Sequence, residues 1–147
     1  MKPLAAIGEA LERFVEAPPG DAAGAAALLA LGEDTLAQWL LAHGREPTDQ
    51  RREGFRLLAL HRQGAEGEPS FNACRETCRE LAYHYNLVTL EPEHPETGRR
   101  LAMMALVANH LYLFVSGKLE TRGLGDFCCS ARPLRQAADE PTTTREN

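Results

Sequence analysis

The sequence predicts an all-α protein, a single bundle-like domain of about six helices. Apolar residues recur with the i, i+3, i+4 spacing of one helix face, and glycines and prolines separate the segments that carry this spacing. No segment shows the strict alternation of apolar and polar residues that marks a half-buried strand. The 147 residues are 44% hydrophobic and 25% charged, a composition typical of a globular domain that can bury one core.

Four helices are expected before residue 64. Each ends at a residue that breaks helices, because glycine favours the left-handed conformation that follows a last turn and proline cannot continue it. Pro18 ends the first segment, and glycines end the other three. The expected segments are, in chain order, 4–15, 21–32 with Asp21 as the cap, 36–44 and 47–64.

Two longer helices are expected after a loop at 64–69, which is also a weak candidate boundary within the domain. Ser70 can cap the fifth helix, over 70–86, and a short extended piece can follow at 86–91. The sixth, over 96–116, is apolar nearly all round and is expected to be the buried central helix. The domain is expected to cover 1–140, with 141–147 as a disordered polar tail.

Charge and hydropathy exclude several classes of partner. The net charge of −5 counts against a nucleic-acid partner, because a phosphate backbone favours a positive surface. The longest apolar run, 101–115, is shorter than the roughly 20 residues that span a bilayer, so no membrane association is expected. Acidic residues come early in the chain, where a secretory signal would be basic and then apolar, so a cytoplasmic location is expected.

The four cysteines form two tight pairs, Cys74 with Cys78 and Cys128 with Cys129. Cys74 and Cys78 are one helical turn apart on the inward stripe of the fifth expected helix, so both thiols should face the core. Four thiols match the ligand number of a zinc ion or an iron-sulfur cluster. His110 could replace one of the four thiols as a ligand. The sequence leaves the identity of a cofactor unknown.

Two other interpretations of the cysteines stay open. Free cysteine is among the most buried residue types, so Cys74 and Cys78 can simply fill the core. Cys128 and Cys129 lie beside Arg132, a cation that favours the thiolate and hence a thiol redox switch. His110 follows Asn109 in the sixth helix, where we expect it to be a core histidine with satisfied hydrogen bonds.

One segment resembles a known module. Arg75 and Arg79, followed by Leu81-Ala82, Asn86-Leu87 and Arg99-Arg100, are similar to the arginine-histidine module of single-stranded nucleic-acid binders. The resemblance implies a basic helix that contacts a single strand. The histidine of that module is replaced here by Arg79, and the strands expected after its helix fall on an apolar run of helical character.

We therefore expect a small, non-enzymatic regulatory or accessory protein with a cysteine-based metal or thiol-redox site. No nucleotide-binding glycine motif, nucleophile elbow or zinc-protease motif occurs in the sequence. The first alternative is an adaptor with purely structural cysteines, in which the first three helices dock another protein. A module that binds single-stranded nucleic acid is the second alternative, and a homo-oligomer stays open.

Overall fold

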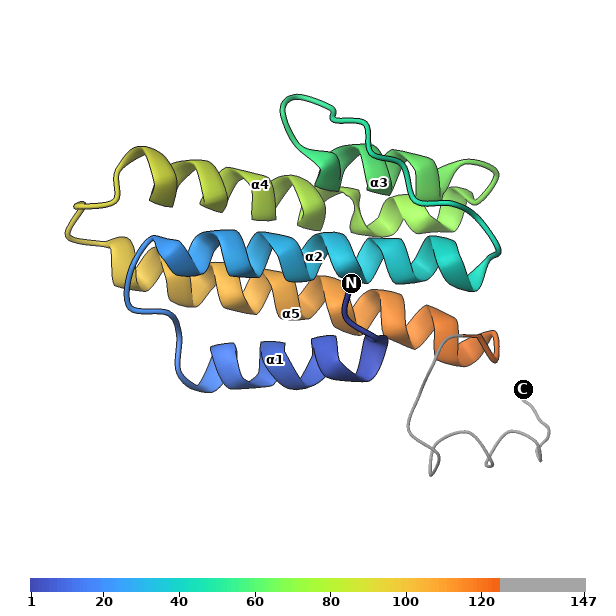
Figure 1. The fold of residues 1–147 in the computed structure, drawn as a ribbon, viewed down its shortest axis with the longest axis horizontal. Coiled ribbons are helices and arrows are strands. Elements are labelled where there is room, and N and C mark those ends of the chain that lie inside the picture. The colour runs from blue at the N-terminus through green and yellow to red at the C-terminus, as the bar shows by residue number, and fades with distance from the viewer. Residues whose placement is uncertain (125–147) are drawn as a thin grey trace.

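The computed structural model describes residues 1–124, and in this range it contains five α-helices, one 3₁₀ helix and no strand (Figure 1). The all-helical class is thus confirmed, with one helix fewer than expected. The elements are α1 (Leu4–Glu16), α2 (Ala23–Ala42), α3 (Arg56–Ala65), η1 (Pro69–Cys74), α4 (Arg75–Leu90) and α5 (Thr97–Thr121). The domain limit at 140 and the tail at 141–147 lie outside the described residues.

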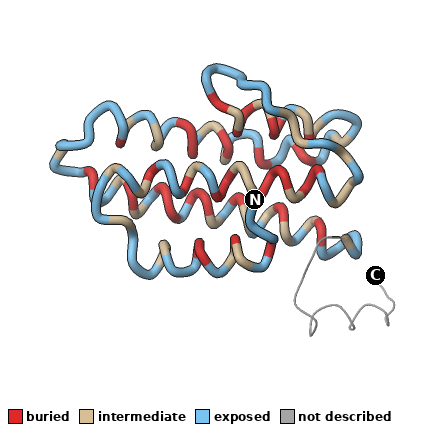
Figure 2. The backbone as a smooth tube through the Cα atoms, viewed as in Figure 1, coloured by how far each residue is buried: buried red, intermediate tan, exposed pale blue. Residues whose placement is uncertain are grey.

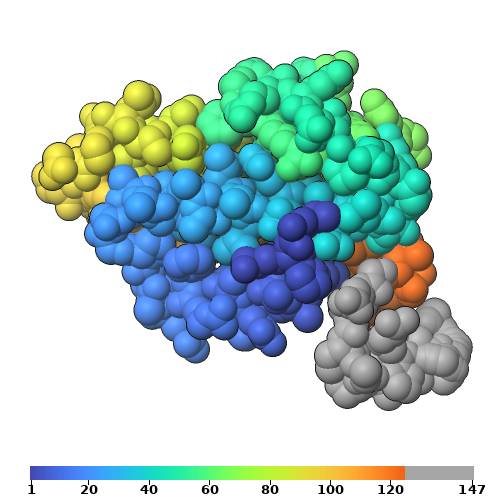
Figure 3. Space-filling model, viewed as in Figure 1, coloured from blue at the N-terminus to red at the C-terminus, as the bar shows by residue number. Residues whose placement is uncertain are grey.

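Helix α5 occupies the centre of the bundle, as the sequence predicts. It packs against α1, α2 and α4, and Figure 1 shows α2 running along it with α1 and α4 on opposite sides. The short elements α3 and η1 lie against α4, and α3 also contacts α2. On the face drawn in Figure 3, α2 and its neighbours hide most of α5, which emerges chiefly at its C-terminal end.

The inward faces of all five α-helices supply one continuous apolar core, which appears as red bands along the tube in Figure 2. Fully buried leucines come from every helix, among them Leu11, Leu28, Leu57, Leu81 and Leu111. Burying one such side chain stabilises the fold by roughly 1.5–3 kcal/mol. This apolar burial holds α1, α2 and α4 against α5, and α3 against α2 and α4.

The expected break at Gly32 is wrong, because residues 23–42 form one continuous helix, α2. Gly32 is buried in the middle of α2, where α3 and α4 approach it. A Cβ atom placed there would lie 2.6 Å from a methyl carbon of Leu81 and 3.2 Å from one of Leu57. The glycine therefore serves close packing between helices rather than helix termination.

The fourth expected helix starts later than the sequence suggests, at Arg56 instead of residue 47. The preceding segment is held in a non-helical conformation by side chains of α3. Gln63 accepts the N–H of Thr48 at 2.9 Å through Oε1, and its Nε2 donates to the carbonyl of Glu46 at 2.8 Å. Arg56 Nε donates to the carbonyl of Thr48 at 2.8 Å. These bonds replace the backbone bonds that a helix would have supplied.

The two C-terminal helices also have limits that differ from expectation. Ser70 lies within η1 and caps no α-helix, since α4 begins at Arg75. The expected extended piece at 86–91 is wrong: α4 continues to Leu90, with Thr89 Oγ1 bonded to the carbonyl of Tyr85 at 2.8 Å. Helix α5 continues past residue 116 to Thr121.

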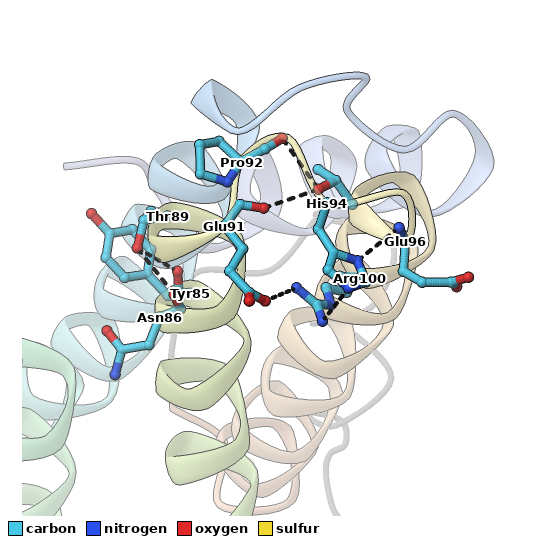
Figure 4. Close-up of polar contacts among 9 residues, drawn as sticks. Tyr85, Asn86, Thr89, Glu91, Pro92, His94, Glu96 and Arg100 are labelled. Atoms are coloured by element: carbon cyan, nitrogen blue, oxygen red, sulfur yellow. Dashed lines mark hydrogen bonds and ion pairs between the residues drawn. The ribbon is translucent and has the colours of Figure 1, made fainter.

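The turn between α4 and α5 is closed by side chains, as Figure 4 shows. Arg100 Nη1 donates to Glu91 Oε1 at 2.8 Å, which joins the last residue before the turn to the first turns of α5. The backbone N–H of Glu96 donates to His94 Nδ1 at 2.9 Å, and Thr97 Oγ1 donates to the carbonyl of Glu91 at 3.3 Å. The carboxylate–guanidinium bond lowers the pKa of Glu91.

Replacing Gly32 by leucine should destabilise the protein by about 3 kcal/mol, because four carbon atoms would enter a space already filled by Leu57 and Leu81. The measurement is urea unfolding followed by circular dichroism. Gly98→Leu is the matched control, since no atom lies within 4 Å of a Cβ at that helical position. We expect it to leave stability unchanged or to raise it by up to about 0.8 kcal/mol through helix propensity. Equal stabilities for the two variants would contradict the packing role of Gly32.

Candidate functional site

The thiols of Cys74 and Cys78 lie together at the start of α4, facing the core as the sequence predicts. Cys74 directly precedes the helix and Cys78 falls in its first turns. Both are free, and only 2% of Cys74 and 0% of Cys78 is exposed. Four residues of helix rise about 6 Å, which is within the Cα separation that a disulfide can bridge.

His61 of α3 is the third member of the site. Its Nε2 lies 3.1 Å from the carbonyl oxygen of Phe71, and Cys74 Sγ donates to the same oxygen at 3.3 Å. Because a carbonyl oxygen can only accept, Nε2 of His61 carries the proton. The imidazole is buried and its ring stacks on that of Phe71, with 5.5 Å between centroids.

The two thiols have opposite acid–base properties. A hydrogen bond from the Cys78 thiol lowers the pKa of Cys74 to about 6, against the effect of burial and with a further contribution from His61. The same bond and burial raise the pKa of Cys78 well above its ordinary value. The position of Cys74 at the N-terminus of α4 acts in the same direction on Cys74, because the positive end of the helix dipole favours a thiolate.

The loss of the Cys74 proton leaves no buried acceptor without a partner. The neutral thiol donates to the carbonyl of Phe71, but this oxygen keeps the N–H of His61 when the thiol ionises. The neighbouring Cys78 thiol also favours the ionised form of Cys74. The surroundings thus favour Cys74 as the nucleophilic sulfur and Cys78 as the sulfur that holds its proton.

An aromatic stack fixes the ring of Phe71. The ring of Trp39 stacks on it at 4.4 Å between centroids, and the ring of Phe114 of α5 lies at 6.0 Å. Gly64 makes room for this stack, since a Cβ there would lie 2.8 Å from the Phe71 ring and 3.1 Å from Trp39. Stacked rings with such separations stabilise each other beyond the area they bury.

An ion pair covers the outer side of the stack. Arg122 lies with Cζ 5.2 Å from the centre of the Trp39 ring and donates two hydrogen bonds to Glu68, at 2.6 and 3.0 Å. Those bonds, with one more from Ser70, lower the pKa of Glu68 to about 2. Lys118 donates to Ser70 Oγ at 2.9 Å and so joins α5 to η1.

The structure describes only some of the residues that the sequence predicts as metal ligands. Cys128 and Cys129 lie outside the described residues. His110 is exposed on α5, so the expectation of a buried histidine with satisfied bonds is wrong. Within residues 1–124, no three His, Cys, Asp or Glu side chains are grouped so that they could hold a metal ion. Zinc or iron-sulfur binding therefore stays a prediction that depends on Cys128 and Cys129.

His61 is the site residue that sequence reasoning missed. It lies three residues before Gly64, near the end of α3. There it belongs to the buried face of the helix, with Leu57, Leu58 and Leu60. A polar residue on an apolar stripe was the available signal. No sequence pattern links His61 with Cys74. The two residues come together only through η1, whose Phe71 carbonyl both of them contact.

Comparison with known proteins adds no relative: no protein family, no curated protein and no solved structure matches the chain. The segment that resembles the arginine-histidine module is helical up to Leu90 and again from Thr97, where that module has strands. One helix in the described range, α5, is long and apolar enough to span a membrane by length and composition alone. A buried core helix meets the same criteria of length and composition, and α5 packs against α1, α2 and α4.

The Glu68–Arg122 pair should make the stability of the fold depend on pH in the acid range. A carboxyl whose pKa is about 2 when folded, against an ordinary 4.5, stabilises the fold fully above pH 4.5 and loses this effect as the pH falls toward 2. We therefore expect Glu68→Gln to lower the melting temperature at pH 7 and to flatten its fall between pH 4.5 and 2. Differential scanning calorimetry from pH 2 to 7 measures this.

Glu93→Gln is the control for that experiment, because Glu93 is exposed in the α4–α5 turn and forms no ion pair with the described residues. Its acid profile should match that of the unmodified protein. A profile of Glu68→Gln that also matches would show that the pair with Arg122 does not contribute.

Proposed function

We propose that this chain is a small, non-enzymatic regulatory or accessory protein that responds to thiol oxidation at Cys74 and Cys78. The observation that carries the proposal is a buried pair of free thiols one helical turn apart, with Cys74 at the N-terminus of α4 and bonded to the carbonyl that His61 also contacts. The opposite directions in which their pKa values shift support the same roles. A redox switch needs one thiolate to attack the oxidant and one neighbouring thiol to resolve the product. Cys74 suits the first role and Cys78 the second.

The oxidant of this proposal is a peroxide. The Cys74 thiolate attacks one peroxide oxygen, the O–O bond breaks, and with one proton taken up the products are a sulfenic acid on Cys74 and water. The Cys78 sulfur then attacks the Cys74 sulfur, its proton leaves with the sulfenic hydroxyl as a second water, and a disulfide forms. Two thiols lose two electrons in total, and hydrogen peroxide becomes two molecules of water.

Burial makes this response depend on local opening. Both sulfurs are shielded from solvent, so a peroxide reaches Cys74 only when η1 or the first turn of α4 moves. A 3₁₀ helix of six residues is a weaker element than the long helices around it, since its hydrogen bonds have poorer geometry. A disulfide would then hold this region in its rearranged form and supply the signal to a protein partner.

The same burial favours a second candidate, an adaptor in which the cysteines only fill the core. Both sulfurs belong to the apolar cluster that joins all the helices. The large exposed apolar side chains, however, lie mainly on α4 and α5 rather than on the first helices. In either case the free thiols suit a reducing compartment, and we propose the cytoplasm.

Peroxide titration of a Cys128→Ser/Cys129→Ser background tests the proposal, because only Cys74 and Cys78 then remain. One equivalent of hydrogen peroxide should remove both thiols, with a mass loss of two hydrogen atoms that dithiothreitol reverses. Adding Cys78→Ser should stop the reaction at a sulfenic acid on Cys74, trapped by dimedone. Adding Cys74→Ser instead should slow oxidation of the remaining thiol at least about tenfold, since burial, the cause that persists without Cys74, still raises the pKa of Cys78 and shields it from peroxide.

Three outcomes would contradict the redox proposal. Thiols that react only in denaturant would assign Cys74 and Cys78 to the core and favour the adaptor. Equal oxidation rates for the two single-thiol variants would remove the division of roles. Stoichiometric zinc or iron in protein purified without oxygen, lost on Cys74→Ser, would replace the switch by a metal site.

A further inference from the structure

A basic hollow of about 220 Å³ opens between the turn at 51–54, α3 and α4. Four arginines contribute to its lining and no acidic residue does, although the chain as a whole carries a net charge of −5. His61 and Asn72 also line it, so the hollow adjoins the thiol site. Its charged and polar residues are Arg52, His61, Arg62, Asn72, Arg75 and Arg79.

The positive charge in this hollow is only partly neutralised. Arg79 pairs with Glu53 at 3.0 Å, and Arg75 pairs with its neighbour Glu76 at 3.2 Å. Arg52 and Arg62 form no ion pair with the described residues. Arg75 and Arg79 are also one turn apart on α4, where like charges repel. Such an arrangement raises the local concentration of anions.

One carboxylate that binds a lining arginine, that of Glu53, belongs to the tight turn beside the hollow. Glu53 has φ of +54°, the one positive value at a non-glycine position in residues 1–124, and Gly54 follows with +85°. Arg52 and Phe55 close this tight turn with two backbone hydrogen bonds of 2.9 Å. Positive φ at both central residues is the pattern of a type I′ turn, in which the second position favours glycine. Both oxygens of Glu53 accept hydrogen bonds from Arg79, at 3.0 and 3.2 Å.

We propose that this hollow binds a phosphate dianion, either free or as a monoester, and that Glu53 occupies Arg79 in its absence. Guanidinium groups bind phosphate through two parallel hydrogen bonds, and Arg62 and Arg75 can supply them from α3 and α4. Asn72 adds an amide donor. The volume exceeds that of a phosphate ion and leaves space for the ester group. The site does not depend on the proposed thiol chemistry.

Calorimetric titration of the full chain with inorganic phosphate and with a phosphate monoester at low salt tests the site. We expect binding of both to weaken at least about tenfold in Arg62→Gln and in Arg75→Gln, the range typical of losing a charge-assisted bidentate contact. Glu53→Gln should strengthen binding several-fold, because the competing carboxylate is removed from Arg79. Arg13→Gln is the control, since Arg13 is exposed on α1, does not line the hollow and forms no ion pair with the described residues.

The outcomes distinguish a specific phosphate site from a general electrostatic attraction of anions. Weaker binding in Arg13→Gln by the same factor, or equal binding of chloride and phosphate, would overturn the proposal. Unchanged affinity in Glu53→Gln would overturn the role of Glu53. Tight binding of a thymidine oligonucleotide that phosphate fails to displace would replace the proposal with a nucleic-acid surface. Binding of the monoester but not of free phosphate would support the site and identify the ester as its ligand.

A second observation concerns the exposed side of α5, opposite its core face. Met103, Leu106 and Leu113 are 45%, 51% and 57% exposed, an unusual concentration of apolar surface on one helix. With His110 and Gly117 they form a straight line, here called the outer stripe, with alternating spacings of three and four residues. This is the spacing of a helix that pairs with another helix along its length. The buried residues of α5 lie outside the stripe, on the faces that pack against α1, α2 and α4.

The charges at the two ends of the outer stripe point to a second copy of this chain as its occupant. Arg99 continues the spacing at one end and Glu120 continues it at the other, and both are exposed. In an antiparallel pair, Arg99 of each copy faces Glu120 of the other, whereas a parallel pair places like charges together. We therefore infer a twofold antiparallel dimer through α5, with His110 nearest the axis and the small Gly117 allowing close approach.

Sedimentation velocity over a hundredfold range of concentration tests the dimer. We expect a monomer–dimer equilibrium that Leu106→Glu shifts to monomer, while Leu90→Glu, at a still more exposed leucine on α4, leaves it unchanged. Arg99→Glu should weaken the dimer, and Arg99→Glu/Glu120→Arg should restore it. A monomer at every concentration, or failure of the double variant to recover the dimer, would overturn the inference. Binding of the monomer to lipid vesicles would assign the stripe to a membrane instead.

Discussion

The side chain and carbonyl of Phe71 connect every part of the candidate site. The ring is fully buried between Trp39 of α2 and His61 of α3, and the carbonyl accepts hydrogen bonds from His61 and Cys74. Gly64 leaves the space that the ring fills. Because one residue of η1 holds both the histidine and the first cysteine, the position of the thiols depends on the packing of this ring. A change in the aromatic stack would therefore change the positions of the sulfur atoms.

The difference between the two thiols comes from one hydrogen bond. Burial opposes ionisation of both sulfurs, and for Cys78 the hydrogen that it donates acts in the same direction. For Cys74, accepting that hydrogen outweighs burial, and His61 adds to the effect. Exposed ion pairs such as Arg75–Glu76 contribute little to stability, since each is screened by solvent. The bidentate Arg122–Glu68 pair, in contrast, lowers the pKa of Glu68 and stabilises the fold. Ion pairs here also position elements, as Arg122 and Glu68 do over the aromatic stack.

Periodicity predicts the helical class, the central helix and the inward position of Cys74 and Cys78, because these depend on which face of a helix is apolar. It fails at Gly32, since a glycine that ends a helix and a glycine that lets two helices touch have the same local sequence. It fails also for His61 and His110. Whether a histidine on an apolar helix faces the core or solvent depends on which neighbouring helix covers it, and only the tertiary packing decides this.

The proposed thiol switch and the proposed anion site share His61, so they should influence each other through charge. A thiolate at Cys74 and a dianion in the hollow repel each other, and this coupling is reciprocal. A bound phosphate therefore favours the protonated Cys74 and slows its attack on peroxide. The disulfide carries no charge, so its formation removes the repulsion and favours the bound anion. Because Arg75 directly follows Cys74, rearrangement of the first turn of α4 also moves one wall of the hollow.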